Sequence, residues 1–426
     1  KASVKLYLND GYDAPEQIED ETVNINSEQY SQMVRSSLLS MGNTFRIQKA
    51  IQKAKSGKPV TLAYIGGSIT QGVGATPIHT ECYAYKSWKM FQKKFAIKEN
   101  VKFIKAGVGG TPSELGMLRF ERDVLRENEQ PDIIVIEFAV NDEGDETKGD
   151  CYESLVRKVL NLPWKPAVVL LFSVFANDWN LQERLQPVGR QYDLPMVSIL
   201  DAVTPQFSGK EQKRVITKNQ FFYDMFHPTN LGHTIMADCL SYFFERCEET
   251  KGLRKNKFVT GIFDEETLER RLLETPVIGN SFESVHLIDK KDSYVGAKID
   301  EGGFVHCDKE LQCVEIDDSL MTVPEFPHNW MYNGDSPENA YFEMKISCKA
   351  LLLIFKDSGE TNVGKADVWV DTEYCLCADP HINNWLHCNA VILFNEKETK
   401  EHIVRIEIPK EEREKCFTIL GFGYVK

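Results

Sequence analysis

The sequence predicts an α/β domain followed by a β-rich domain. Up to residue 250, short continuous apolar runs alternate with amphipathic stretches of helical spacing. Beyond residue 250, helical periodicity largely disappears, and short strand candidates follow one another between turns rich in Gly, Asp and Asn. A length of 426 residues also suits two domains better than one.

The α/β prediction rests on five apolar runs with amphipathic segments between them. The predicted strands span residues 60–65, 101–106, 133–139, 167–175 and 196–200, and the predicted helices span residues 83–95, 113–126, 152–160, 181–192 and 230–249. Continuous apolar runs are typical of parallel strands covered on both faces, and the alternation favours a doubly wound, three-layer domain. Ahead of it, residues 4–8 suggest a short strand and residues 37–55 a helix.

The second half begins with a charged segment at residues 251–257 and a short helical stretch at 265–273. Strand candidates then follow at residues 304–307, 341–346, 351–355, 366–370, 390–394, 402–408 and 417–424. This pattern favours an antiparallel β-sandwich of jelly-roll type. We therefore place one domain at residues 1–250, with an N-terminal extension over 1–57, and the second at 251–426.

Composition narrows the possible partners. A formal net charge of -14 argues against nucleic acid and against an anionic membrane surface, and no apolar stretch is long enough to span a bilayer. The eleven cysteines are odd in number and scattered, which favours free thiols in a reducing, cytoplasmic compartment. Because the chain begins at Lys1, secretion after removal of a leader is the alternative. The oligomeric state stays open.

Three short segments carry polar or glycine residues directly after predicted strands. Ser68 follows the first strand, glycines 107, 109 and 110 follow the second, and Asn141 follows the third. Open parallel sheets bind ligands at this edge, where a serine can act as nucleophile and a glycine N–H or an Asn amide can stabilise an oxyanion. Taken singly, each segment is equally typical of a helix N-cap or a turn.

A fourth segment, at residues 224–228, supplies an acid–base pair. Asp224 and His227 stand three positions apart just before the last predicted helix. This offset lets the carboxylate turn back onto Nδ1 of the imidazole, which leaves Nε2 free to take a proton from Ser68. The four segments together contain every group that acyl transfer needs, and that chemistry requires no metal and no cofactor.

With these four blocks in this order, residues 58–248 resemble the SGNH (GDSL-type) hydrolase superfamily, whose catalytic domain has a flavodoxin-like fold. The resemblance implies that Ser68 is the nucleophile, that His227 is the general base and then acid, and that Asp224 orients it. It also implies an oxyanion hole made by the N–H of Ser68, by Asn141 and by Gly110, although Gly107 or Gly109 remains open as the glycine donor. Gly67 stands where the family often has Asp.

The β-rich second half suggests the substrate. Its combination with an SGNH domain resembles bacterial carbohydrate esterases that deacetylate plant polysaccharides, mannan before xylan, in which the sandwich resembles a carbohydrate-binding module. An acetylated oligosaccharide is thus the expected partner. Candidate sugar contacts are Asn329 and Trp330 in one loop and Asn384 and Trp385 in another, while for both Trp residues a place in the core is the alternative. Two rival functions are a lipid or thioester acylhydrolase and an inactive sugar-binding protein.

Overall fold

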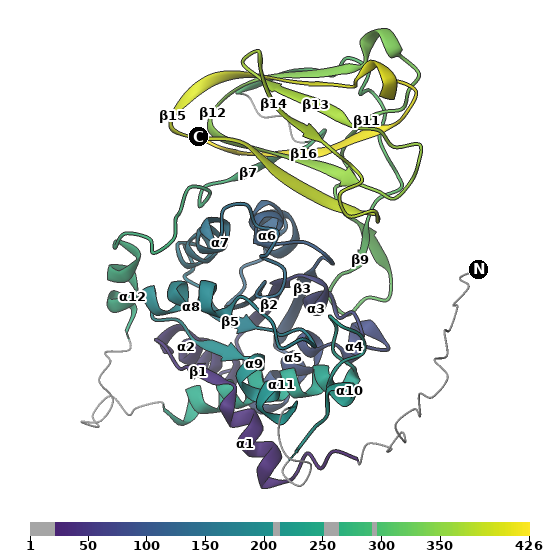
Figure 1. The fold of residues 1–426 in the computed structure, drawn as a ribbon. Helices are drawn as coiled ribbons and strands as arrows, with labels where there is room; N and C mark the ends of the chain where they lie inside the picture. Colours follow the sequence, from purple (N-terminus) through teal and green to yellow (C-terminus); the bar gives the residue numbers. More distant parts are fainter. Residues whose placement is uncertain (1–21, 208–213, 251–263, 292–295) are drawn as a thin grey trace, which may run out of the picture.

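The protein consists of two domains, one above the other in Figure 1. The computed structural model describes residues 22–207, 214–250, 264–291 and 296–426. The predicted strand at 4–8 and the predicted linker at 251–257 lie outside these residues. Among the described helices, none has the length and apolar character that crossing a bilayer requires.

The lower domain is built on a six-stranded sheet in the order β1-β6-β5-β4-β2-β3. The strands are β1 Leu38–Ser40, β2 Val60–Gly66, β3 Val101–Gly107, β4 Ile133–Glu137, β5 Ala167–Phe172 and β6 Met196–Ser198. All neighbouring pairs are parallel except β1 with β6. This is the parallel α/β sheet that the continuous apolar runs predict.

Helices cover both faces of this sheet and make the domain three-layered (Figure 1). One face packs against α1 Glu28–Ser36, α2 Phe45–Lys55, α5 Tyr83–Phe95, α9 Ile199–Phe207 and α11 Asn230–Glu249. The other packs against α6 Ser113–Phe120, α7 Asp150–Leu160, α8 Gln182–Gln191 and α12 Glu265–Leu272. Short helices α3 Ser68–Gln71, α4 Ile78–Glu81 and α10 Lys218–Phe221 and the π-helix η1 Glu121–Leu125 complete the domain.

The segment at residues 37–55 differs from the predicted single helix. It contains the edge strand β1, in which Leu38 pairs with Val197, and the helix begins only at Phe45. The helical spacing of the apolar residues extends across both elements because each turns its apolar side to the same core. Pairing with a strand far along the sequence therefore overrides the local periodicity.

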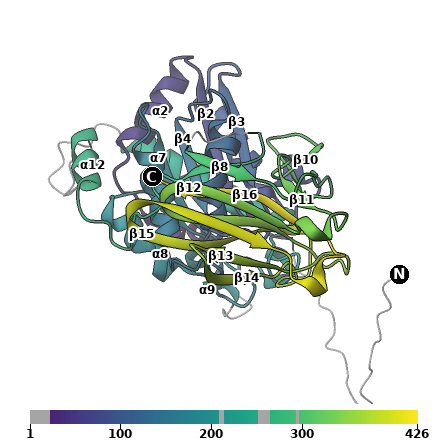
Figure 2. The ribbon, with the colours of Figure 1, turned by 90° about the horizontal axis from the view of Figure 1, so that it is seen from above.

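The upper domain is antiparallel. Its strands are β7 His286–Ile288, β8 Ala297–Asp300, β9 Cys313–Glu315, β10 Thr322–Pro324, β11 Trp330–Tyr332, β12 Tyr341–Asp357, β13 Ala366–Val370, β14 Glu373–Ala378, β15 His387–Glu407 and β16 Phe417–Val425, with 3-10 turns at η4 Pro337–Asn339 and η5 Lys410–Glu412. Within the described ranges, β9 pairs with β10 alone, and the other eight strands join in one sheet that encloses a separate apolar core. Seen from above, β12, β15 and β16 run long across the α/β domain (Figure 2).

Five of the predicted strand candidates differ from the observed strands. The candidates at 341–346 and 351–355 are one strand, β12, with a bulge between Cys348 and Ala350, and those at 390–394 and 402–408 are both parts of β15. Residues 304–307 form no strand and make a single bridge, from His306 to Met331. The sequence pattern splits each long strand into two candidates because polar residues interrupt its apolar run. These polar residues lie on the face of the strand that meets solvent, and in the sequence they resemble a turn.

The second half of β12 joins the two domains. Its residues are buried on both faces, whereas its first half alternates between buried and more exposed positions. On one face, Leu351, Leu353 and Phe355 pack in the core of the upper domain. On the other face, Ala350, Leu352 and Ile354 pack in the core that contains α6 and α7. The β-rich domain is thus packed on the α/β domain through a continuous apolar interface.

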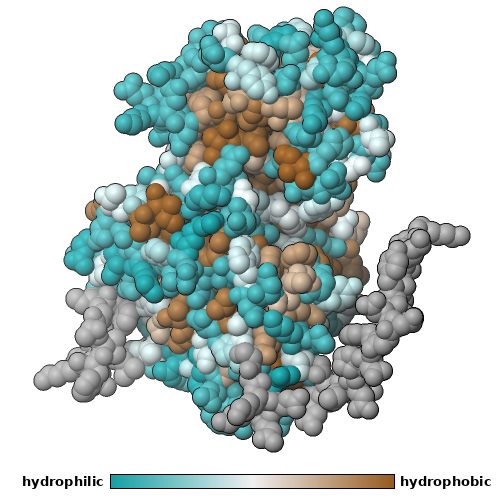
Figure 3. Space-filling view, viewed as in Figure 1, coloured by the Kyte–Doolittle hydropathy of each residue, from teal (hydrophilic) through white to brown (hydrophobic). Residues whose placement is uncertain are grey.

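The segment after residue 263 packs with the α/β domain before the chain enters the upper sheet. Leu268 and Leu272 of α12 lie in the core beneath α7, and the Nε of Arg46 donates a 3.1 Å hydrogen bond to Glu265. The first strand of the upper sheet is β7. By packing, α12 therefore belongs with the first domain, although the sequence places it in the second. On the face shown in Figure 3, apolar surface gathers on the upper domain and near the junction.

Candidate active site

Three neighbouring strands bring the predicted strand-end residues to one edge of the sheet. β2 lies between β3 and β4, and Gly66 at the end of β2 is level with Gly107 of β3 and with Glu137 of β4. The segments that follow these strands therefore start side by side. They are the segments that carry Ser68, Gly110 and Asn141.

Ser68, His227 and Asp224 form a continuous hydrogen-bonded chain. The Oγ of Ser68 lies 3.0 Å from Nε2 of His227. The Nδ1 of the same imidazole lies 3.0 Å from Oδ1 and 2.9 Å from Oδ2 of Asp224. This is the arrangement in which a carboxylate orients an imidazole toward a hydroxyl.

Asp224 is held in its ionised form by the turn that contains it. Burial alone would raise the pKa of this carboxyl, but hydrogen bonds from His227 and from two backbone N–H groups outweigh it and lower the pKa. The N–H groups are those of Phe226, at 2.7 Å, and His227, at 2.8 Å. The short spacing that the sequence shows thus gives Asp224 three partners within one turn.

The glycine segment offers a backbone donor at Gly110. The N–H of Gly109 already donates to Oε1 of Gln71, at 3.0 Å, and Gly107, the last residue of β3, does not line the cavity in front of Ser68. Gly110 has φ +73, and its N–H has no hydrogen-bond acceptor among the described residues. Of the three glycines that the sequence leaves open, the geometry therefore favours Gly110.

Asn141 lies directly against the nucleophile turn. A Cβ at Gly67 would come within 2.2 Å of Oδ1 and 2.8 Å of Nδ2 of Asn141. The absence of a side chain at Gly67 is what lets the Asn141 amide approach. Oδ1 is buried and has no hydrogen-bond partner in the described part of the chain, and the residue lines the cavity in front of Ser68.

A cavity of about 630 Å³ opens in front of Ser68 and has walls from both domains. The α/β domain supplies most of its lining. This part includes Ser68, Gly110 and Asn141 and the apolar side chains of Val73, Phe175 and Phe226. The β-rich domain supplies Gln312, Cys313, Trp385 and Leu386. The second domain is therefore part of the candidate active site.

Trp385 stands at the mouth of this cavity. Its side chain is half-exposed, at 45%, and a Cβ at Gly110 would lie only 2.4 Å from its ring. The ring stacks on the imidazole of His387, with centroids 4.4 Å apart and planes at 13°. The Nε2 of His387 contacts the amide of Asn383 at 3.0 Å, and that amide also donates to Asp357 at 3.1 Å. The Trp385 ring is thus supported from behind.

The other predicted sugar loop is wrong. Trp330 is 2% exposed and packs edge-on against Phe342 in the core of the upper domain, with Nε1 donating to Glu301 at 3.0 Å. Asn329 is fully buried, and its amide donates to backbone carbonyls on either side of the loop, Asp308 at 3.0 Å and Phe326 at 3.1 Å. Both residues are unavailable to a ligand because β11 pairs with β16 and folds inward.

Asn384 is exposed and has φ 55, but it does not line the cavity. It precedes Trp385, and its conformation belongs to the turn that presents that ring. Sequence reasoning missed Gln71, Gln312 and Phe226 at the site. Phe226 lies inside the Asp224–His227 segment and is 49% exposed, and an aromatic residue between this Asp and His is a signal that the sequence does contain.

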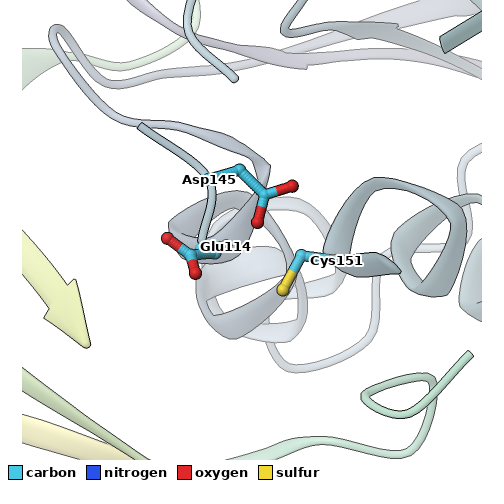
Figure 4. Close-up of side chains that lie close together, drawn as sticks. All are labelled: Glu114, Asp145 and Cys151. Atoms are coloured by element: carbon cyan, nitrogen blue, oxygen red, sulfur yellow. The ribbon is translucent and has the colours of Figure 1, made fainter. Parts of the chain in front are cut away.

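Among the described residues, one group offers three possible metal ligands within 4.8 Å of one another: Glu114, Asp145 and Cys151 (Figure 4). All three are buried, and Asp145 already accepts hydrogen bonds from the N–H groups of Thr147, at 2.8 Å, and Gly149, at 2.6 Å. Burial raises the pKa of Glu114 to about 9 and also raises the pKa of the Cys151 thiol. Metals bind the deprotonated forms, so this donor set fits a buried loop anchor better than a metal.

Comparison with known proteins agrees with this geometry. Residues 64–235 match the model of the GDSL-like Lipase/Acylhydrolase family. A two-domain esterase (CEX) active on acetylated mannans, crystallised with mannopentaose, is similar at 25% identity and a TM-score of 0.73, covering 92% of this chain and 98% of that one. A second structure of such an esterase gives 25% identity and a TM-score of 0.72, with coverage of 92% and 99%. No curated protein sequence matches the chain.

The α/β domain therefore matches the GDSL-like lipase and acylhydrolase model over the region in which the four sequence blocks predict a resemblance, and the protein is a carboxylic ester hydrolase. The likeness to the two-domain esterase extends over both domains, because 92% of the chain is covered.

Proposed function

We propose that this protein is a serine esterase that removes O-acetyl groups from oligosaccharides derived from plant polysaccharides, with acetylated mannan as the first substrate and acetylated xylan as the second. The observation that carries the proposal is the position of Trp385: the β-rich domain places an exposed, supported indole beside Gly110 at the mouth of the cavity. A flat aromatic face of this kind suits a sugar ring, and a small acetyl group fits beneath it.

In the proposed reaction, Oγ of Ser68 attacks the acetyl carbonyl carbon while Nε2 of His227 takes the hydroxyl proton over their 3.0 Å contact. The carbonyl oxygen becomes an oxyanion held by the N–H of Ser68, the N–H of Gly110 and the amide of Asn141. Collapse of this intermediate breaks the ester bond, and His227 returns the proton to the departing sugar hydroxyl. Water then repeats the sequence on the acetyl-enzyme and releases acetate. Asp224 stabilises the imidazolium in both steps.

Two further points support a sugar ester. The solved structure that resembles this chain over both domains is an esterase described as active on acetylated mannans and was crystallised with mannopentaose. In addition, the cavity is shared between domains, so a polymeric substrate lying across the junction would contact both of its walls. A lipid or thioester acylhydrolase would instead use the apolar side chains of Phe175, Phe226 and Leu386 to hold a long acyl chain.

An inactive sugar-binding protein is the other rival. The intact hydrogen-bonded chain from Asp224 through His227 to Ser68 argues against it, because a binding protein has no use for a nucleophile paired with an oriented base. A fluorophosphonate that labels Ser68 in the native protein, and fails to label a Ser68→Ala variant, would rule out the inactive alternative.

The decisive experiment measures acetate release from acetylated manno- and xylo-oligosaccharides by the wild type and by Ser68→Ala. We expect release by the wild type, faster from mannan fragments, and a loss of roughly 10⁴-fold or more in the variant, since removing a nucleophile removes the covalent route. Long-chain acyl esters and acyl thioesters serve as comparison substrates. Rapid turnover of those esters with no acetate from either glycan would contradict the sugar assignment and leave the ester hydrolase.

We also propose a reducing, cytoplasmic compartment for the protein. Its eleven cysteines are all free thiols in the structure, so the fold does not depend on a disulfide. Thiol titration of the protein purified from its native host under non-reducing conditions tests this. Finding disulfides there would favour secretion.

A further inference from the structure

The most informative contact outside the catalytic chain crosses the domain junction. Gln312 lies just before β9, which reaches down from the upper domain beside α3 and β3 (Figure 1). Its side chain is 8% exposed, and its Nε2 donates a 2.8 Å hydrogen bond to the carbonyl oxygen of Gly109. Its Oε1 accepts a 3.0 Å hydrogen bond from the N–H of Cys388. Both ends of the amide are therefore engaged.

The carbonyl of Gly109 and the N–H of Gly110 belong to the same peptide group. This group is planar and, in the trans form, directs its C=O and its N–H to opposite sides. A donor that fixes the carbonyl therefore fixes the direction of the N–H. Gly110 is the glycine whose N–H is free to meet an oxyanion, so Gln312 controls the orientation of that donor from behind.

This peptide needs external support because two adjacent glycines flank it. Glycine has little intrinsic preference between the two signs of φ, and Gly110 sits at φ +73, so a flip of the peptide is opposed by few local contacts. The preceding peptide is held in the same manner, since Oε1 of Gln71 accepts from the N–H of Gly109 at 3.0 Å. Gln71 in turn donates to Glu315 of β9 at 2.9 Å. The β9 segment thus supports both sides of Gly109.

The hydrogen bond also polarises the peptide. A donor at the carbonyl oxygen draws electron density from the amide nitrogen and makes the N–H a better donor, an effect that is larger in a buried setting. Orientation and polarisation both act on the state that carries the negative charge. They have little influence on the neutral ester in the ground state.

We propose that Gln312 is a positioning residue for catalysis, through which the β-rich domain aligns the Gly110 N–H in the oxyanion hole. The proposal rests on the proposed role of Gly110. It makes the second domain necessary for the chemical step itself, in addition to any part it has in holding sugar. A residue about 200 positions downstream in the sequence then governs a donor in the α/β domain.

The test uses Gln312→Met in the full chain, which removes both hydrogen bonds and keeps a side chain of similar length. With 4-nitrophenyl acetate as a small substrate, we expect kcat to fall about tenfold and KM to stay within twofold, somewhat less than the loss from deleting an oxyanion donor outright. The affinity for a trifluoromethyl ketone, which adds to Ser68 as a tetrahedral oxyanion, should fall by a similar factor. A role limited to domain adhesion would alter neither kcat nor ketone binding selectively.

Gln182→Met is the matched control, because Gln182 is also about nine-tenths buried and does not line the cavity. It should leave both readouts unchanged. If Gln312→Met does not fold, Gln312→Glu keeps the acceptor for Cys388 and removes the donor to Gly109, and it should show the same loss of kcat. Unchanged kcat in a folded variant, or lost kcat with unchanged ketone affinity, overturns the proposal. Because the ester carries no sugar, this result is independent of whether acetylated glycans are the substrate.

Discussion

The two walls of the cavity differ in what their residues do. The α/β wall presents Ser68, Asn141 and His227, which lie where a reacting ester would be. The β-rich wall presents Trp385 at the mouth and Gln312 behind the glycine segment, and neither has a group placed to react. On the proposed function, the chemistry comes from short segments at the ends of parallel strands, and substrate recognition and support come from the domain packed against them.

This difference has a structural basis. Segments that follow neighbouring parallel strands start at the same edge, so the α/β wall is assembled from residues close to their own strands. The β-rich wall depends on the long strand β12, whose second half is buried between the two domains, and on the β9 segment that extends from the upper domain. Any shift of that interface would move Trp385 and Gln312 together.

The comparison predicts its largest effect at Asn141. Asn141→Ala should lower kcat for a small acetate ester by roughly 10²–10³, with little change in KM, because the amide acts on the oxyanion and not on the bound ester. Its Oδ1 has no partner to lose, so the thermal unfolding temperature should change little. Asn141→Asp, which replaces the donor by an acceptor, is the control and should be at least as slow. A rise in KM with kcat preserved would show that Asn141 binds the substrate and does not stabilise the oxyanion.

A smaller effect is expected at the β-rich wall. Trp385→Ala should raise KM for an acetylated oligosaccharide about tenfold, equivalent to about 1.4 kcal/mol, and change KM for 4-nitrophenyl acetate much less. Trp369→Ala is the matched control, since Trp369 is in the same domain, packs against Tyr374 at 5.3 Å and does not line the cavity. Equal losses on both substrates would mean that Trp385 shapes the reaction site and contacts no sugar.

The same division explains what could be predicted from the sequence. The order Ser68, Gly110, Asn141, Asp224 and His227 could be read because each residue is marked by a strand end or by a short offset, both of which are local. The residues of the second domain that reach the cavity could not be predicted in this way, since their positions depend on which strands pair across large sequence separations.

The two tryptophan loops make this point clearly. Both contain Trp beside Asn and His, and nothing local separates them. Trp330 is buried because β11 pairs with β16, nearly ninety positions later, whereas Trp385 is held out by a turn at Asn384 and by stacking on His387. Gln312 gives no local signal at all, because its partners are Gly109 and Cys388.

The last effect is on stability and not on rate, and it concerns a second carboxyl in the α/β domain. Glu137 ends β4 beneath the nucleophile turn, and its Oε2 accepts a 3.0 Å hydrogen bond from the hydroxyl of Thr70. Unlike Asp224, whose hydrogen bonds outweigh its partial burial, Glu137 is fully buried, and burial raises its pKa to about 7. The nucleophile turn is therefore built on a carboxyl that is partly neutral near neutral pH.

The sign of the pH effect follows from proton binding. Between about pH 4.5 and 7 the native protein keeps the Glu137 proton and the unfolded chain loses it, so the free energy of unfolding falls as pH rises, and it stops falling above about 7. Glu137→Gln removes this contribution, so its stability relative to the wild type should increase by roughly 1 kcal/mol per pH unit across that window. Urea unfolding at pH 5, 6, 7 and 8 measures the difference, and other buried acids cancel in it. If the free energies of unfolding of the two proteins differed by the same amount at every pH, Glu137 would already be ionised at pH 5. Its burial beneath Ser68 would then make no pH-dependent contribution to stability.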